Sequence, residues 1–172
     1  SGTFGKVGCY SFHPRKSVTT GEGGMIVTDD VVTADRIKVL RSHGGVRGEF
    51  YFRFEDAGFN YRLSDIQAAV GVAQMRRLDW LVSNKRRLAS QLSQMLSGVV
   101  GVRAPIEPEN YLHTYQSYVV MLDEKFNRDS VIAAMRRKGV ETTLGTYAFH
   151  AEPVSQRMFG YHPGDLPTSY SI

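Results

Sequence analysis

The chain has 172 residues, of which 42% are hydrophobic and 22% are charged. This balance excludes wholesale disorder, because enough apolar surface is present to offset the entropy lost on ordering. The net charge of +4 suits phosphorylated ligands, but it is too small and too scattered to indicate a nucleic-acid-binding protein.

The single cysteine, Cys9, excludes an internal disulfide framework and a cysteine-based zinc site, and it favours a reducing, cytoplasmic location. The five histidines lack the spacing of a metal site, so no metal is expected. No apolar run approaches the roughly 18 residues that cross a bilayer, and no signal peptide is visible. The chain starts without Met and enters an apolar stretch almost at once, which predicts that it is an internal fragment.

The first half alternates short strands and helices. Residues 7–12 and 25–28 are predicted strands, joined by a loop rich in Thr and Gly that contains Lys16. Thr33 is then predicted to cap a helix that reaches about His43, with Gly44 as its stop.

The middle of the chain holds the strongest local signal. Residues 45–62 form a long connection without periodicity, which is more often a binding loop than filler. Ser64 and Gln67 then have the spacing of a capping box. Helical spacing of apolar residues follows, which predicts one helix over residues 65–96 with a bend near residues 83–84.

Ser97-Gly98 is a predicted domain boundary, after which the pattern changes. Asn127 is predicted to cap a helix that Gly139 ends. The tail from residue 147 is predicted to be irregular. Strands are predicted on either side of the helix, over residues 101–103, 115–122 and 140–143.

Lys16 is the first candidate for chemistry. It follows a predicted buried strand and precedes a glycine-rich turn, and strand ends are where rigid scaffolds present reactive groups. A lysine that is desolvated there becomes a nucleophile toward carbonyl groups. From spacing alone, an ordinary surface lysine is the favoured interpretation.

Ser11 and Asn60 are candidates for phosphate binding. Ser11 lies at the end of the same predicted strand as Lys16, where its hydroxyl can donate to a phosphate. Asn60 precedes the capped helix, whose N-terminus favours anions. A role in turn geometry alone is the alternative for Asn60.

The ordered combination of these motifs resembles the DegT/DnrJ/EryC1/StrS aminotransferase family, pyridoxal-phosphate enzymes that aminate nucleotide-linked keto-sugars. The resemblance covers roughly the first ninety-five residues, with a weaker echo in residues 139–150. It is carried by Ser11-Phe12-His13-Pro14-Arg15-Lys16, Thr20-Gly21-Glu22-Gly23-Gly24-Met25, Leu40-Arg41-Ser42-His43-Gly44 and Gly58-Phe59-Asn60-Tyr61-Arg62-Leu63-Ser64-Asp65-Ile66-Gln67-Ala68-Ala69.

The resemblance implies an α/β fold that is part of a fold-type I pyridoxal-phosphate-dependent transferase. Residues 1–97 would be the end of its large α/β/α domain, with the long connecting helix, and residues 98–172 an incomplete small α+β domain. The implied partners are a second copy of the chain in a homodimer, a sugar nucleotide and an amino acid, usually glutamate, with no nucleic acid and no membrane.

The resemblance also assigns roles to four residues. Lys16 would hold pyridoxal 5'-phosphate covalently through its amine and move the substrate proton, and Ser11 would bind the cofactor phosphate. Asn60 would reach that phosphate in the neighbouring subunit, and His150 would lie near the sugar-nucleotide pocket.

An upstream half of the family's large domain has no counterpart in this sequence. By resemblance, that half supplies an aromatic residue over the cofactor ring and an acid for the ring nitrogen. These 172 residues are therefore expected not to transaminate alone. The alternative is an inactive remnant that only dimerises or binds a phosphorylated ligand.

Overall fold

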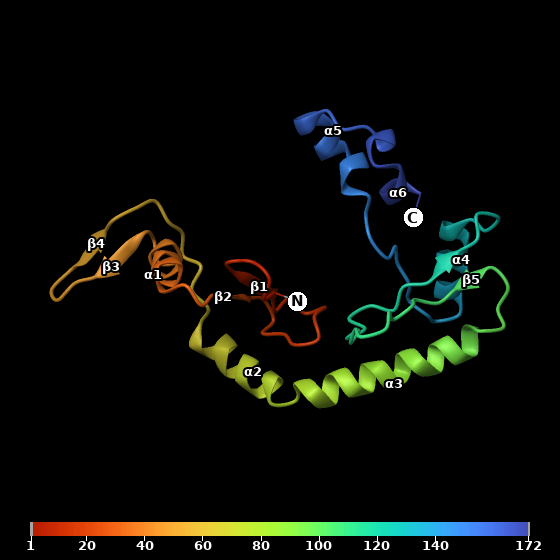
Figure 1. Cartoon of the computed structure of the whole chain (residues 1–172), viewed down its shortest axis with the longest axis horizontal. Coiled ribbons are helices and arrows are strands. Elements are labelled where there is room, and N and C mark those ends of the chain that lie inside the picture. The colour runs from red at the N-terminus through yellow and green to blue at the C-terminus, as the bar shows by residue number, and fades with distance from the viewer. Residues whose placement is uncertain (1, 172) are drawn as a thin grey trace. The chain divides into compact units, whose positions relative to one another are not determined.

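The computed structural model describes residues 2–171 and mixes helices with short strands, as an α/β class predicts. The chain divides into two units, one ending at Asn84 and the other beginning at Lys85, and both are seen in Figure 1. The division falls inside a long helix, whereas the predicted domain boundary at Ser97-Gly98 follows the end of that helix. That boundary stays a prediction.

Two antiparallel strands open the first unit. Strand β1 (Gly8–Ser11) pairs with β2 (Gly24–Val27), with Gly8 opposite Val27 and Ser11 opposite Gly24. Both predicted strands are therefore present, each within one or two residues of its expected limits. The pairing brings the two ends of the intervening loop together.

Helix α1 (Val31–Leu40) starts and ends earlier than predicted. Its N-cap is Asp30 rather than Thr33, because the Asp30 carboxylate accepts a hydrogen bond from the Val32 amide at 3.2 Å. Thr33 lies inside the first turn and donates its hydroxyl to the same carboxylate. That hydroxyl is the main cause of the lowered pKa of Asp30. The expected extension to His43 is wrong, since the helix ends at Leu40.

A hairpin occupies part of the segment that was expected to be an irregular connection. Strands β3 (Gly45–Arg47) and β4 (Phe52–Phe54) pair antiparallel, and Figure 1 shows them beside α1. With three residues each, the strands are too short for an alternating pattern to reveal them in the sequence.

The predicted long helix is two helices. Helix α2 (Asp65–Met75) begins with the expected capping box of Ser64 and Gln67. Helix α3 (Leu78–Leu96) follows after a tight turn at residues 76–77, so the bend predicted near residues 83–84 is wrong. At this turn the Arg77 guanidinium lies 4.8 Å from the ring centre of Trp80, a contact that closes the turn against the start of α3.

The second unit contains a two-residue ladder and a capped helix. Strand β5 (Val102–Arg103) pairs with β6 (Met121–Leu122), and α4 (Arg128–Arg137) is capped by Asn127, as predicted. Only the end of the predicted strand 115–122 forms, as β6. Tyr115 itself has a φ of 47°, which is incompatible with an extended strand. Residues 140–143 do not form the strand that was predicted for them.

The tail has more structure than predicted. Prolines stand at the first position of three of its elements, where their fixed φ suits a helix start. The elements are η1 (Phe149–Ala151), α5 (Pro153–Phe159), η2 (Pro163–Asp165) and α6 (Pro167–Tyr170).

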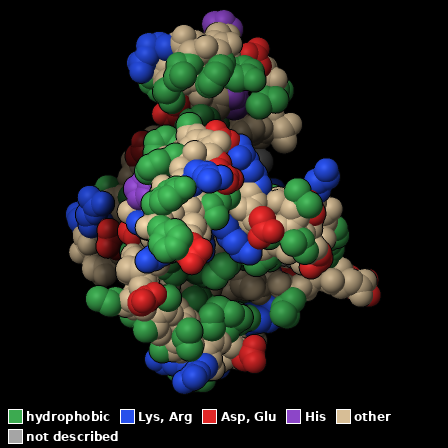
Figure 2. All heavy atoms as spheres, turned by 90° about the vertical axis from the view of Figure 1, so that its left-hand side faces the viewer, with side chains coloured by type: hydrophobic (Ala, Val, Ile, Leu, Met, Phe, Trp, Pro, Cys, Tyr) green, Lys and Arg blue, Asp and Glu red, His purple; other side chains and the backbone are tan. Residues whose placement is uncertain are grey.

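Hydrophobic burial is sparse in both units. Among the hydrophobic side chains of residues 2–171, Val18 and Ala89 are buried. Large apolar side chains such as Phe50 and Ile66 are more than four-fifths exposed, and Figure 2 shows hydrophobic groups spread over the visible surface. Exposed apolar surface on this scale is typical of faces that pack against another protein surface. Within residues 2–171, no helix is both long and apolar enough to span a membrane.

An ion pair ties the segment after α3 back onto that helix. Arg86 donates to both carboxylate oxygens of Glu107, at 2.7 and 3.0 Å, and to the His113 carbonyl at 2.7 Å. The Glu107 carboxylate also accepts the His113 amide at 2.7 Å. The bond from Arg86, followed by that from His113, lowers the pKa of Glu107.

This ion pair predicts a pH-dependent stability. The folded pKa of Glu107 lies below its unfolded value of about 4.3, so the pair stabilises the fold above that pH and the gain is lost as the pH falls through the folded pKa. We expect Glu107→Gln to lower the melting temperature at pH 7, and the difference from wild type to shrink below about pH 4. Thermal unfolding between pH 3 and 7 measures this. A constant difference, or an equal loss in the exposed control Glu109→Gln, would contradict it.

Candidate functional site

The candidate site is built on the loop between β1 and β2. At its neck, the Phe12 amide donates to the Gly23 carbonyl at 2.9 Å, and the Thr20 amide donates to the Phe12 carbonyl at 3.1 Å. Lys16 lies in the loop, half-buried, with its own amide donating to the His13 carbonyl at 2.9 Å. Lys16 therefore lies on a loop whose two ends are joined by backbone hydrogen bonds.

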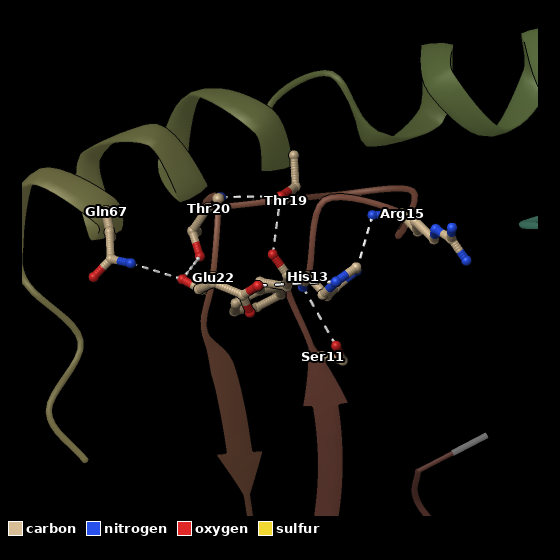
Figure 3. Close-up of polar contacts among 9 residues, drawn as sticks. Ser11, His13, Arg15, Thr19, Thr20, Glu22 and Gln67 are labelled. Carbon is tan, nitrogen blue, oxygen red and sulfur yellow. Dashed lines mark hydrogen bonds and ion pairs between the residues drawn. The ribbon is translucent and has the colours of Figure 1, made fainter.

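Two threonine hydroxyls hold this loop from inside (Figure 3). Thr19 Oγ1 donates to the Phe12 carbonyl at 2.9 Å and accepts the Gly21 amide at 3.0 Å. Thr20, which is buried, donates its hydroxyl to the Glu22 carbonyl at 2.7 Å. These bonds pair loop backbone groups that would otherwise need other hydrogen-bond partners, and they favour the closed form of the loop.

Ser11 lies at the end of β1, at the base of the same loop. Its Oγ accepts the His13 amide at 3.3 Å, which leaves the hydroxyl hydrogen available to a ligand. The His13 ring is fixed in turn, since Nδ1 accepts the Arg15 amide at 3.1 Å and Nε2 lies 3.8 Å from the Glu22 carboxylate. The structure thus brings Ser11 and Lys16 to one strand end and its loop.

Asn60 belongs to a separate part of the first unit. It forms an isolated antiparallel bridge with Ser42, in which the His43 amide donates to the Phe59 carbonyl and the Tyr61 amide to the Arg41 carbonyl, both at 2.9 Å. The Asn60 side chain is exposed, and its Oδ1 accepts from Arg62 Nε at 2.9 Å. With Oδ1 bonded to Arg62, the amide NH₂ group is the donor that Asn60 offers to a ligand such as a phosphate.

His150 lies in the second unit and is buried. Its Nε2 is 3.2 Å from the Pro163 carbonyl, and its ring meets Tyr170 edge-on at 6.4 Å. These contacts fix the tail elements to one another and account for the burial. A role at the sugar-nucleotide pocket stays a prediction.

Gln67 connects the lysine loop to helix α2, a contact that the sequence analysis did not anticipate. Its Nε2 donates to the Glu22 carbonyl at 2.8 Å, across 45 residues of sequence (Figure 3). The spacing from Ser64 identified Gln67 as a capping residue, and no local pattern could reveal a partner so far along the chain.

The sequence model of the DegT/DnrJ/EryC1/StrS aminotransferase family matches residues 1–172. Among curated relatives, the spore coat polysaccharide biosynthesis protein SpsC of Bacillus subtilis is 30% identical, over 98% of this chain and 46% of that protein. A GDP-perosamine synthase of Vibrio cholerae is 31% identical, over 99% of this chain and 46% of that protein. The chain spans less than half the length of these relatives.

Solved structures agree in fold. The aminotransferase TlmJ of Streptoalloteichus hindustanus superposes with a TM-score of 0.84 at 32% identity, over 90% of this chain and 42% of that chain. The protein Spr1654 of Streptococcus pneumoniae superposes with a TM-score of 0.91 at 18% identity, over 99% of this chain and 45% of that chain, which is a likeness in fold alone. The matches confirm the predicted fold class, part of a fold-type I α/β transferase.

The neck of the lysine loop predicts the effect of one substitution. A Cβ added at Gly23 would lie 2.6 Å from Thr20 Oγ1 and 2.9 Å from Leu63 Cδ1. We therefore expect Gly23→Ala to destabilise the fold by about 1–3 kcal/mol and to speed hydrogen exchange of amides 12–23. Gly98→Ala is the control, because a Cβ there meets nothing within 4 Å. Equal stability and exchange in the two variants would contradict the packing at the neck.

Proposed function

The chain belongs to the DegT/DnrJ/EryC1/StrS aminotransferase family, and we propose that it forms part of an enzyme that aminates a nucleotide-linked keto-sugar with pyridoxal phosphate as cofactor. The observation that carries the proposal is Lys16, half-buried on a loop that is closed at the end of β1 by backbone and threonine bonds. A closed loop fixes the backbone from which the Lys16 amine extends, and a defined position favours a nucleophile toward an aldehyde.

The residues present fit this cofactor. A primary amine and a hydroxyl with a free hydrogen, on one strand end and its loop, match a group that carries an aldehyde and a phosphate. Lys16 would hold the aldehyde end, and Ser11 would donate to the phosphate. The free NH₂ group of Asn60 would donate to the phosphate bound by the partner subunit of a homodimer.

When bound, pyridoxal phosphate supplies a ring that takes up the electrons released at the substrate's α-carbon. The residues of this chain would orient the cofactor and transfer protons. Lys16 Nζ would accept the proton from the α-carbon of the amino-acid donor and later return a proton to the sugar carbon that receives the nitrogen. Because the loop is closed, Lys16 Nζ would stay within a limited distance of both the donor α-carbon and the sugar carbon.

The names of the relatives support the substrate class. A GDP-perosamine synthase acts in the chemistry of a GDP-linked amino sugar, and the spore coat protein SpsC serves polysaccharide biosynthesis. We propose a nucleotide-linked sugar as acceptor and glutamate as donor, in amino-sugar biosynthesis for a polysaccharide. A cytoplasmic location is part of the proposal and rests on the single unpaired cysteine, Cys9.

The first test is the covalent attachment of the cofactor. In the protein expressed from its complete gene, pyridoxal phosphate should give an absorbance band at about 400–430 nm, and Lys16→Ala should abolish both the band and transamination. The exposed lysine variant Lys38→Ala is the control and should keep both. After borohydride reduction, mass spectrometry should find the cofactor on Lys16. A label on another lysine would refute the assignment.

The second test separates the phosphate contact from the aldehyde contact. Ser11→Ala should weaken binding of pyridoxal phosphate by about tenfold or more, because a hydrogen bond to a charged group contributes about 1.5–3 kcal/mol. Binding of pyridoxal, which lacks the phosphate, should not change. Absorbance titrations with both compounds measure this. An equal loss for pyridoxal would show that Ser11 shapes the loop and does not bind the phosphate.

A further inference from the structure

We propose that Gln67 is a positioning residue for Lys16, acting through the neck of the lysine loop. The inference rests on the proposed role of Lys16 and adds a residue to it. Within residues 2–171, Gln67 makes no hydrogen bond to Lys16 or Ser11, so its effect passes through the backbone of Glu22.

The Gln67 side-chain amide is oriented by the helix start. Its Oε1 accepts from the Ser64 hydroxyl at 2.9 Å and lies 3.4 Å from the Ser64 amide. With the acceptor side of the amide turned toward Ser64, the NH₂ side faces the loop, where Nε2 reaches the Glu22 carbonyl at 2.8 Å. The capping box therefore prepares the amide for the second contact.

The Glu22 carbonyl accepts two hydrogen bonds, one from inside the loop and one from helix α2. It accepts from Gln67 Nε2 and also from the buried Thr20 hydroxyl at 2.7 Å. The next residue, Gly23, supplies the carbonyl that receives the Phe12 amide and closes the loop. Figure 3 shows Gln67 reaching from α2 toward this point. A bond at Glu22 thus holds the returning arm of the loop to a helix, while Lys16 lies on the outgoing arm.

Capping and positioning can be separated by substitution. Glutamate at position 67 keeps the capping box, since it is a usual residue at that place, but it has no NH₂ group to give to Glu22. Its carboxylate would instead face a carbonyl, an acceptor against an acceptor. Conversely, Ser64→Ala removes the cap and one of the two contacts that orient the Gln67 amide, but it keeps the Ser64 backbone amide and the Gln67 NH₂ group that reaches Glu22. The two variants form a matched pair.

The test uses the protein expressed from its complete gene, with pyridoxal phosphate as probe. We expect Gln67→Glu to weaken formation of the 400–430 nm band by about fivefold to tenfold, the loss of one hydrogen bond, with a melting temperature close to wild type. Without cofactor, hydrogen exchange of amides 13–23 should be several-fold faster in Gln67→Glu, while exchange in α3 should be unchanged. Ser64→Ala should lower the melting temperature and affect the band less than Gln67→Glu does.

The outcomes distinguish this inference from the proposed function. If the wild-type protein shows no lysine-bound band, the proposed function fails, and the exchange measurement still tests whether Gln67 holds the loop. If wild type shows the band and Gln67→Glu matches it in both affinity and exchange, Gln67 has no positioning role. An equal or larger loss of the band in Ser64→Ala would also overturn the inference, since the effect would then belong to the cap.

Discussion

The hydrogen bonds between Phe12 and the returning arm of its loop are the constraint on which the candidate site depends. The Phe12 amide and carbonyl pair with Gly23 and Thr20, so the chain leaves β1 and returns to Phe12 at both of these residues. Between those ends lies Lys16, whose amine has chemical use only if its position is defined. Glycine is required at position 23 because the threonine that braces the loop leaves no space for a side chain there.

A hydrogen bond from outside the loop adds to those within it. Gln67 joins the Glu22 carbonyl to the start of α2, and the segment before α2 carries Asn60. In the proposed dimer, Lys16 serves the site of its own subunit and Asn60 that of the partner. One helix start would then support residues of both sites, and an error in its placement would affect the two sites together.

Few hydrophobic side chains are buried within residues 2–171. Two hydrophobic side chains are buried in residues 2–171, while many large ones are exposed. A fold of this size ordinarily derives most of its stability from buried apolar area. The hydrogen bonds around Lys16 determine the local shape of the loop, and the exposed apolar side chains form faces of the kind that pack against another protein surface.

The sequence by itself determined the features that depend on neighbours within a few residues. The β1 and β2 strands, the Ser64–Gln67 capping box and the Asn127 cap follow from local hydrogen bonding and local hydrophobic pattern, and each was predictable. The ordered motifs around Lys16 also indicated the family.

Only the tertiary structure decided the features that join distant residues or override a local pattern. Residues 76–77 are two arginines, which are good helix formers, yet the helix breaks there. The expected strand over residues 115–122 begins at Tyr115, which has a left-handed backbone. The bond from Gln67 to Glu22 joins residues 45 apart, and Asn60 meets Ser42 in a bridge. Periodicity and capping rules describe the nearest turns of the chain, and they contain no information about which distant carbonyl a side chain will find.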